Sequence, residues 1–123
     1  MLSVKFENVP DELRQYSQWV NWKLTPRKGG EKPTKPPFQP NGKFAESNNP
    51  QTWCSFQDVQ NAADNFDGVG FVLSQDDPYV ALDFDHCRCP AFNLIDPDVE
   101  QHIKNFNSYG EISPSGKGLR VFV

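Results

Sequence analysis

The sequence predicts an α+β fold, a mostly antiparallel sheet of about five strands with two to three helices. Short runs in which apolar and polar residues alternate indicate strands, and apolar residues at helical spacing after capping residues indicate helices. Turn-forming residues between neighbouring strand-like runs favour antiparallel pairing. Because 123 residues can build one modest core and not two, we expect a single domain over residues 1–123 and exclude a multidomain enzyme within them.

Three segments have helical signals. A short turn is predicted to begin at Pro10, because proline is tolerated at the first helical position and acidic residues follow it. Ser55 resembles a helix cap, and the apolar residues after it recur at helical spacing: Phe56, Val59, Ala63 and Phe66. A third helix is predicted from Asp96-Pro97-Asp98 to about Asn105, with Asp96 as the cap.

Strands are predicted over residues 19–24, 68–73, 79–85, 109–113 and 119–123. The runs 68–73 and 79–85 are separated by Ser-Gln-Asp-Asp-Pro, whose residues favour turns, so we expect these two strands to form a β-hairpin. Residues 25–40 contain five prolines and two adjacent glycines, which disfavours regular hydrogen bonding. A long basic, Pro/Gly-rich loop is therefore expected over residues 25–43.

Charge is segregated along the chain although the net charge is only −4. Six of the twelve basic residues lie in residues 23–43 beside one acid, whereas residues 44–87 contain acids and no basic residue. This pattern suits a site where acid-bound cations lie beside a lysine-bound phosphate backbone. A solvated loop is the alternative explanation.

The beginning of the chain lacks the basic and apolar regions of a secretory signal, and no run approaches the roughly 18 apolar residues of a membrane span. We therefore expect a cytoplasmic protein without a membrane partner. Cys54, Cys87 and Cys89 are odd in number, and two of them are separated by a single residue, so reduced thiols are expected.

Asp83 and Asp85 are the first candidates for chemistry. In a strand their side chains point to the same face, with α-carbons roughly 7 Å apart. From that distance two carboxylates can converge on Mg²⁺ or Mn²⁺, as two-metal phosphoryl transfer requires. Two like charges in an apolar strand also cost stability, which disfavours a purely structural role. The alternative is a solvated sheet face.

The second candidate is the segment Ser113-Pro-Ser-Gly-Lys-Gly-Leu-Arg120. Its glycines allow the backbone to approach a ligand, and Lys117 and Arg120 offer positive charge to a phosphate. It is not a P-loop, because a strand follows and the Gly-Lys-Ser/Thr ending is absent. A glycine-rich hairpin turn is the alternative.

Two further patterns have ordinary explanations. His86, Cys87 and Cys89 could be part of a zinc site, but a structural site needs four ligands, so Cys54 and His102 would have to complete it. The tryptophans Trp19, Trp22 and Trp53 could stack on bases, but in so small a domain we favour a role in the core.

Several segments, in this order, resemble the N-terminal primase-polymerase domain of phage and plasmid replication proteins, a branch of the archaeo-eukaryotic primase superfamily. They are Trp19-Val-Asn-Trp22, Lys35-Pro-Pro-Phe-Gln-Pro40, Trp53-Cys-Ser-Phe56, Gly68-Val-Gly-Phe-Val-Leu73, Asp77-Pro-Tyr-Val-Ala-Leu-Asp-Phe-Asp-His86 and Ser108-Tyr-Gly-Glu-Ile-Ser-Pro-Ser-Gly-Lys-Gly-Leu119. The resemblance spans about residues 10–123, and its last two segments are the specific ones. It implies part of an RRM-like primase-polymerase core.

The resemblance also implies an activity, metal-dependent nucleotidyl transfer with nucleoside triphosphates on a single-stranded DNA template, and a replicative helicase domain or subunit as a partner. Asp83 and Asp85 match the acids that bind the catalytic Mg²⁺ or Mn²⁺. The phosphate-binding motif falls on Gly118, Leu119 and Arg120. Three further residues of the site are then expected to contact the nucleotide: Ser113, Ser115 and Lys117. Three lysines are expected to contact the template backbone: Lys28, Lys32 and Lys35.

The sequence departs from the family pattern in two places. Arg120 stands where the family has histidine, which changes the geometry and charge of the phosphate contact. The family's third acidic motif should lie beyond residue 123, and the family's catalytic domain is longer than this chain. We therefore expect either a piece of a larger replication protein or a non-catalytic module that binds single-stranded DNA or a replication partner. A zinc-binding adaptor is the third possibility.

Overall fold

A computed structural model describes residues 4–106 and 108–122. These residues divide into two compact units, which we call the N-terminal unit, residues 4–74, and the C-terminal unit, residues 75–122. Within the described ranges there are three α-helices and eight strands, and the named strands pair antiparallel throughout. The predicted α+β class is therefore confirmed. The single domain expected over residues 1–123 stays a prediction.

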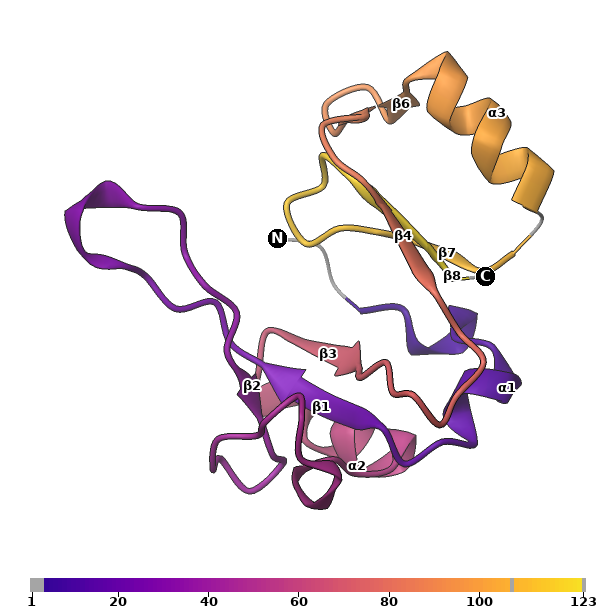
Figure 1. Ribbon diagram of the computed structural model, residues 1–123. Helices are drawn as coiled ribbons and strands as arrows, with labels where there is room; N and C mark the ends of the chain where they lie inside the picture. The colour runs from indigo at the N-terminus through magenta and orange to yellow at the C-terminus, as the bar shows by residue number, and fades with distance from the viewer. Residues whose placement is uncertain (1–3, 107, 123) are drawn as a thin grey trace. The chain divides into compact units, whose positions relative to one another are not determined.

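A three-stranded sheet in the order β2-β1-β3 lies at the centre of the N-terminal unit (Figure 1). The middle strand β1 (Trp19–Trp22) pairs with β2 (Pro37–Phe38) on one side and with β3 (Gly68–Phe71) on the other. The register places Trp22 opposite Gly68. A Cβ atom at position 68 would overlap the indole ring of Trp22, so glycine leaves the space that the ring occupies.

Short helical segments complete this unit: η1 (Phe6–Asn8), α1 (Asp11–Arg14), η2 (Lys28–Gly30), η3 (Pro50–Thr52), α2 (Phe56–Asn61) and η4 (Ala63–Asn65). Helix α1 begins at Asp11, one residue after the predicted start, and Pro10 is its N-cap. The predicted cap of α2 is also confirmed, because the Ser55 hydroxyl accepts a hydrogen bond from the backbone N–H of Asp58 at 3.2 Å. Helix α2 ends at Asn61, before the end of the apolar pattern that runs to Phe66.

The core of the N-terminal unit forms around Trp19. Its ring centroid lies 4.9 Å from that of Phe56, and its indole N–H donates to the Leu13 carbonyl at 3.2 Å. Asn21 is fully buried, and its amide donates to the Val59 carbonyl at 3.1 Å, which ties β1 to α2. The expected core role is confirmed for Trp19, and the other two tryptophans are half-buried.

A second three-stranded sheet, in the order β4-β8-β7, forms the centre of the C-terminal unit. Its strands are β4 (Ala81–Phe84), β7 (Gly110–Ile112) and β8 (Leu119–Phe122), and the separate pair β5 (Arg88–Cys89) and β6 (Leu94–Ile95) precedes helix α3 (Pro97–Phe106). The Asp96 carboxylate accepts from the N–H of Asp98 at 3.0 Å, which confirms the predicted cap of α3. Val121 in the middle strand is 1% exposed and lies in the core of this unit.

The prediction that residues 68–73 and 79–85 form a β-hairpin is wrong. β3 pairs with β1, β4 pairs with β8, and the two strands belong to different sheets. The residues between them do form a turn, in which the Asp77 carboxylate accepts from the N–H of Tyr79 at 2.9 Å. A turn signal reports only a local change of direction, whereas the partner of each strand is decided by packing with residues far along the chain.

The strands of the described residues are also divided among three small sheets and do not form one sheet. The sequence pattern identifies strand-forming segments, but it carries no direct record of which segments share a sheet. Among the described residues, no helix is long and apolar enough to cross a membrane.

The close approach of Gly68 to Trp22 makes a prediction about stability. Gly68→Ala should destabilise the N-terminal unit by about 1–3 kcal/mol, because the new methyl group must displace the indole ring. Gly70→Ala, on the same strand, is the matched control, since a Cβ there meets Val20 at an ordinary 3.6 Å. Urea unfolding followed by circular dichroism measures both. Equal stability of the two variants would contradict the assigned register.

Candidate functional site

A row of charged side chains crosses the sheet of the C-terminal unit. The register places Asp83 of β4 opposite Arg120 of β8, and Arg120 opposite Glu111 of β7. Directly opposed residues of antiparallel strands project from the same face, so the cation lies between two carboxylates. Arg120 Nε donates to Asp83 Oδ1 at 2.7 Å, and Nη2 lies 3.4 Å from Oδ2. The guanidinium therefore grips Asp83 through both oxygens, on an exposed part of the sheet.

The surroundings of this row shift the proton affinity of its members. The hydrogen bond that Arg120 donates to Asp83 raises the arginine pKa, so the guanidinium stays charged. Glu111 is exposed at the surface, but the protein groups packed around its carboxyl partly desolvate it and raise its pKa. The charge of Asp83 adds to this, although the Tyr109 hydrogen bond and Arg120 oppose it. The Tyr109 hydroxyl donates to Glu111 Oε2 at 3.0 Å, and burial and this carboxylate raise the tyrosine pKa.

Asp85 lies directly after the end of β4 and is exposed. Its α-carbon is 3.6 Å from the point where a Cβ atom of residue 118 would stand, and the Phe84 carbonyl is 2.8 Å from that point. Only glycine at position 118 permits this approach of two backbones. The segment that carries Asp85 is thereby packed against the end of the glycine-rich segment.

Residues 113–118, which we call the glycine loop, are held by their own hydrogen bonds. The Ser113 hydroxyl accepts from the N–H of Gly118 at 3.0 Å and lies 3.1 Å from the Ser115 hydroxyl. The N–H of Lys117 donates to Ser115 Oγ at 3.2 Å, and Gly116 adopts φ +80°, a conformation suited to glycine. The loop is thus pre-shaped, with the Lys117 side chain exposed.

Two side chains at this site were not singled out by the sequence analysis. Arg88 Nη1 donates to the Gly116 carbonyl at 2.8 Å, and the backbone N–H of Arg88 donates to the Lys117 carbonyl at 2.9 Å. Arg88 therefore supports the glycine loop from the segment after β4. Glu111 is the second. Its position in a predicted strand directly before the glycine loop was a usable signal, because strands joined by a short loop commonly pair, as β7 and β8 do.

The structure therefore brings most of the predicted site residues together in the C-terminal unit: Asp83, Asp85, Ser113, Ser115, Lys117, Gly118 and Arg120. The three lysines expected to follow a template, Lys28, Lys32 and Lys35, belong to the N-terminal unit.

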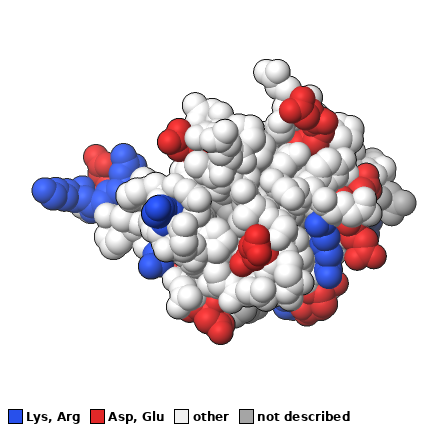
Figure 2. Space-filling view, turned by 90° about the horizontal axis from the view of Figure 1, so that it is seen from below, with Lys and Arg blue, Asp and Glu red and all other residues white. Residues whose placement is uncertain are grey.

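Those lysines lie on a projecting hairpin, residues 23–36, which we call the basic arm (Figure 1). Thr25 and Thr34 close it with reciprocal backbone hydrogen bonds of 2.7 and 3.0 Å. Gly29 and Gly30 both adopt positive φ near its tip. Figure 2 shows Lys and Arg side chains gathered on the arm, and the basic residues of this segment are exposed: Lys23, Arg27, Lys28, Lys32 and Lys35.

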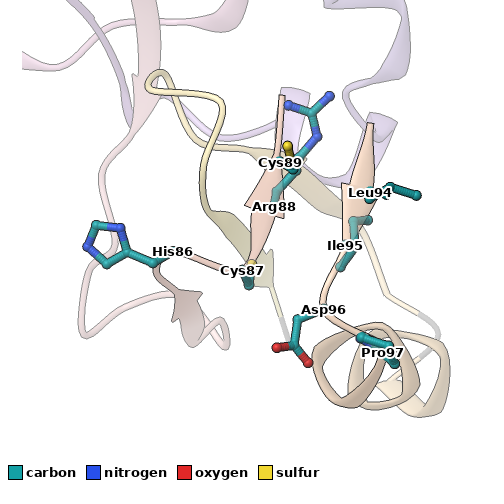
Figure 3. Close-up of a pocket in the computed structure, with 8 residues that line it drawn as sticks. All are labelled: His86, Cys87, Arg88, Cys89, Leu94, Ile95, Asp96 and Pro97. Atoms are coloured by element: carbon teal, nitrogen blue, oxygen red, sulfur yellow. The ribbon is translucent and has the colours of Figure 1, made fainter. Parts of the chain in front are cut away.

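A pocket of about 520 Å³ lies between residues 86–89 and residues 94–97 (Figure 3). Cys54, Cys87 and Cys89 are free thiols, as expected. The side chain of His86 points away from Cys87 and Cys89. Across residues 4–106 and 108–122, no three His, Cys, Asp or Glu side chains gather closely enough to hold one metal ion, so the zinc interpretation gains no support.

The donors at the β4–β8 pair fit a different kind of metal site. Asp83 and Asp85 supply hard carboxylate oxygens, and the described part of the chain adds no third ligand to them. Mg²⁺ and its analogues keep several waters and are commonly held by one or two carboxylates together with substrate phosphates. Two carboxylates beside a glycine-rich loop that carries Lys117 match that requirement, provided that Arg120 releases Asp83.

The raised pKa of Glu111 predicts a pH-dependent effect on stability. A carboxyl group whose pKa rises on folding contributes stability at low pH and loses it as the pH rises above the unfolded value. Glu111→Gln, which keeps an acceptor for Tyr109, should therefore raise Tm at pH 7 and change it little below about pH 4. Thermal melts at both pH values measure this, with the exposed Glu7→Gln as control. A lower Tm for Glu111→Gln at pH 7 would contradict the assignment.

Comparison with known proteins supplies one clear similarity. No family model matches the chain. The chain is 40% identical over 114 residues to a DNA primase-polymerase of Nitratiruptor phage NrS-1. The match covers 90% of this chain and 15% of the relative, so the chain spans a small part of that protein's length. The chain is therefore similar to one part of that primase-polymerase.

Proposed function

We propose that the chain is the nucleotidyltransferase domain, or part of it, of a phage or plasmid DNA primase-polymerase. The pairing of β4 with β8 carries this proposal, because it sets Asp83 against Arg120 and packs the segment of Asp85 against Gly118. Acidic metal ligands and a glycine-rich, basic loop are then adjacent. Their proximity is what metal-dependent nucleotidyl transfer requires, in which a hydroxyl attacks the α-phosphate of a nucleoside triphosphate and pyrophosphate leaves.

In this proposal Asp83 and Asp85 hold Mg²⁺ or Mn²⁺, which when bound activates the attacking hydroxyl and neutralises charge on the triphosphate. Lys117 and Arg120 bind the phosphates, and Gly118 lets the end of the glycine loop pack against the segment that carries Asp85. Ser113 and Ser115 keep the loop in its shape through their hydroxyl contacts. The basic arm binds the single-stranded DNA template through Lys28, Lys32 and Lys35. A replicative helicase domain or subunit is the expected partner.

The first test is calorimetric titration of the chain with a nucleoside triphosphate, with and without Mn²⁺. Binding should require the metal, and Asp83→Asn/Asp85→Asn should abolish it because the metal loses its carboxylates. Asp64→Asn/Asp98→Asn is the matched control, since it removes the same charge from exposed positions outside the glycine loop. Undiminished metal-dependent binding in the first double variant would remove the proposal.

The second test concerns the competition between Arg120 and metal for Asp83. Arg120→Gln should strengthen Mn²⁺ binding without nucleotide by roughly two- to fivefold, the range of an exposed ion pair. The same variant should weaken triphosphate binding, because glutamine cannot replace the charged fork that binds a phosphate. Electron paramagnetic resonance measures the Mn²⁺ affinity. Arg120→Lys keeps the charge without the planar fork, so its affinities for Mn²⁺ and triphosphate should lie between those of the wild type and Arg120→Gln. Unchanged Mn²⁺ affinity would show that the ion pair does not cover the site.

A second candidate function is a non-catalytic module that binds single-stranded DNA. The exposed basic arm favours this function, because lysines bind a phosphate backbone without metal and the arm belongs to a different unit from the carboxylates. DNA binding with strong salt dependence, together with no binding of triphosphate in Mn²⁺, would select this function over the first.

A further inference from the structure

A stack of one half-buried and one exposed aromatic ring lies next to the basic arm in the N-terminal unit. The rings of Phe38 and Phe44 are 4.9 Å apart between centroids and 24° from parallel. Phe38 belongs to β2, and Phe44 forms an isolated antiparallel bridge with it. A tight turn joins them, in which the N–H of Gln39 donates to the Lys43 carbonyl at 2.7 Å and Gly42 adopts φ +90°. The backbone therefore holds the stack in place.

Phe44 is 69% exposed, although its neighbour Ala45 is 6% exposed and anchors the chain. Phe38 covers one face of the Phe44 ring, so the exposed surface includes the opposite face. Single exposed apolar residues are common on protein surfaces and carry no argument alone. A ring that is stacked on one side and open on the other, however, has the geometry of a base-stacking platform.

Basic residues lie close to this stack in space or in sequence. The Lys23 ammonium, at the base of the basic arm, lies 5.9 Å from the Phe38 ring and 5.3 Å from the Phe66 ring. Residues 23–44 contain six basic residues and one acid, and that acid, Glu31, is itself paired with Arg27 at 3.3 Å. The surface around Phe44 is therefore suited to a polyanion. An acidic peptide satisfies the charge but offers no regular series of flat rings.

We propose that Phe44 stacks against a base of single-stranded nucleic acid whose phosphates follow the basic arm. This rests on the template-binding part of the proposed function and adds a residue that contacts the strand through its bases. Stacking on an aromatic side chain is worth about five- to a hundredfold in affinity for each base. It also selects single strands, since bases within a duplex already stack on one another.

The test is fluorescence anisotropy of the full chain with a short labelled oligodeoxythymidylate. Phe44→Leu keeps an apolar side chain and removes the ring, so it should weaken binding about fivefold or more. Phe44→Trp should bind at least as tightly as the wild type. Phe92→Leu is the matched control, because Phe92 is 75% exposed and lies in the other unit.

Salt titration separates stacking from charge. Phe44→Leu should leave the slope of log affinity against log salt unchanged, whereas Lys28→Gln/Lys32→Gln should reduce it by about 0.7 for each phosphate that is no longer neutralised. An oligonucleotide of abasic sites provides a readout that needs no variant, since the wild type should bind it more weakly than oligodeoxythymidylate.

The outcomes distinguish this inference from the function it rests on. Wild-type binding that is equally tight in Phe44→Leu and on the abasic probe would overturn the platform and leave the template role of the lysines. If polyglutamate competes with the oligonucleotide and Phe44→Leu binds the oligonucleotide as tightly as the wild type does, an acidic protein partner is indicated. That result would overturn the stacking platform as well. Failure of the wild type to bind any strand at low salt would overturn both the platform and the template role, whatever the triphosphate titration shows.

Discussion

The pairing of β4 with β8 is the constraint on which the candidate site depends. Asp83 and Arg120 are 37 positions apart in the chain, and the register of their strands alone decides that they meet. A slip of one residue would turn Arg120 into the core of the unit and bring Val121, now 1% exposed, to the charged face. Burial of the apolar residues of β8 therefore also fixes the position of the charged ones. In this unit the register of β4 with β8 decides both which apolar residues are buried in the core and which charged residues meet at the site.

Arg120 has two possible partners in this arrangement. In the structure its guanidinium is held by Asp83, with Glu111 on its other side. A phosphate can accept the same pair of hydrogen bonds from a guanidinium that a carboxylate accepts. Arg120 can therefore exchange one partner for the other with little change in the position of its side chain. Under the proposed function, triphosphate would draw Arg120 away from Asp83 and leave that carboxylate for metal. Nucleotide and metal would then favour each other's binding, which is a coupling between two ligands of one site.

The candidate binding groups of the two units are held in place to different degrees. In the C-terminal unit the glycine loop is shaped by hydrogen bonds from Ser113, Ser115 and Arg88, so a ligand would meet groups that are already arranged. In the N-terminal unit the basic arm is closed by one pair of backbone contacts between Thr25 and Thr34, and its charged side chains extend into solvent. Long-range attraction of a polyanion suits such side chains, because it does not require exact placement. The Phe38–Phe44 stack beside the arm is held by the backbone hydrogen bond between Gln39 and Lys43.

The sequence by itself determined the local features of this protein. Ser55 and Asp96 cap helices where their side chains can reach the next free backbone N–H, and the α+β class follows from such local patterns. It also singled out Asp83, Asp85 and the glycine loop, because their residue types are unusual for the strands and turns that carry them. Only the tertiary structure decided strand partners: it separated β3 from β4, paired β4 with β8, and set Glu111 and Arg88 beside the candidate site. The physical reason is that caps and turns are contacts between near neighbours in the chain, whereas sheet partners are chosen by burying apolar surface among residues that the sequence keeps far apart.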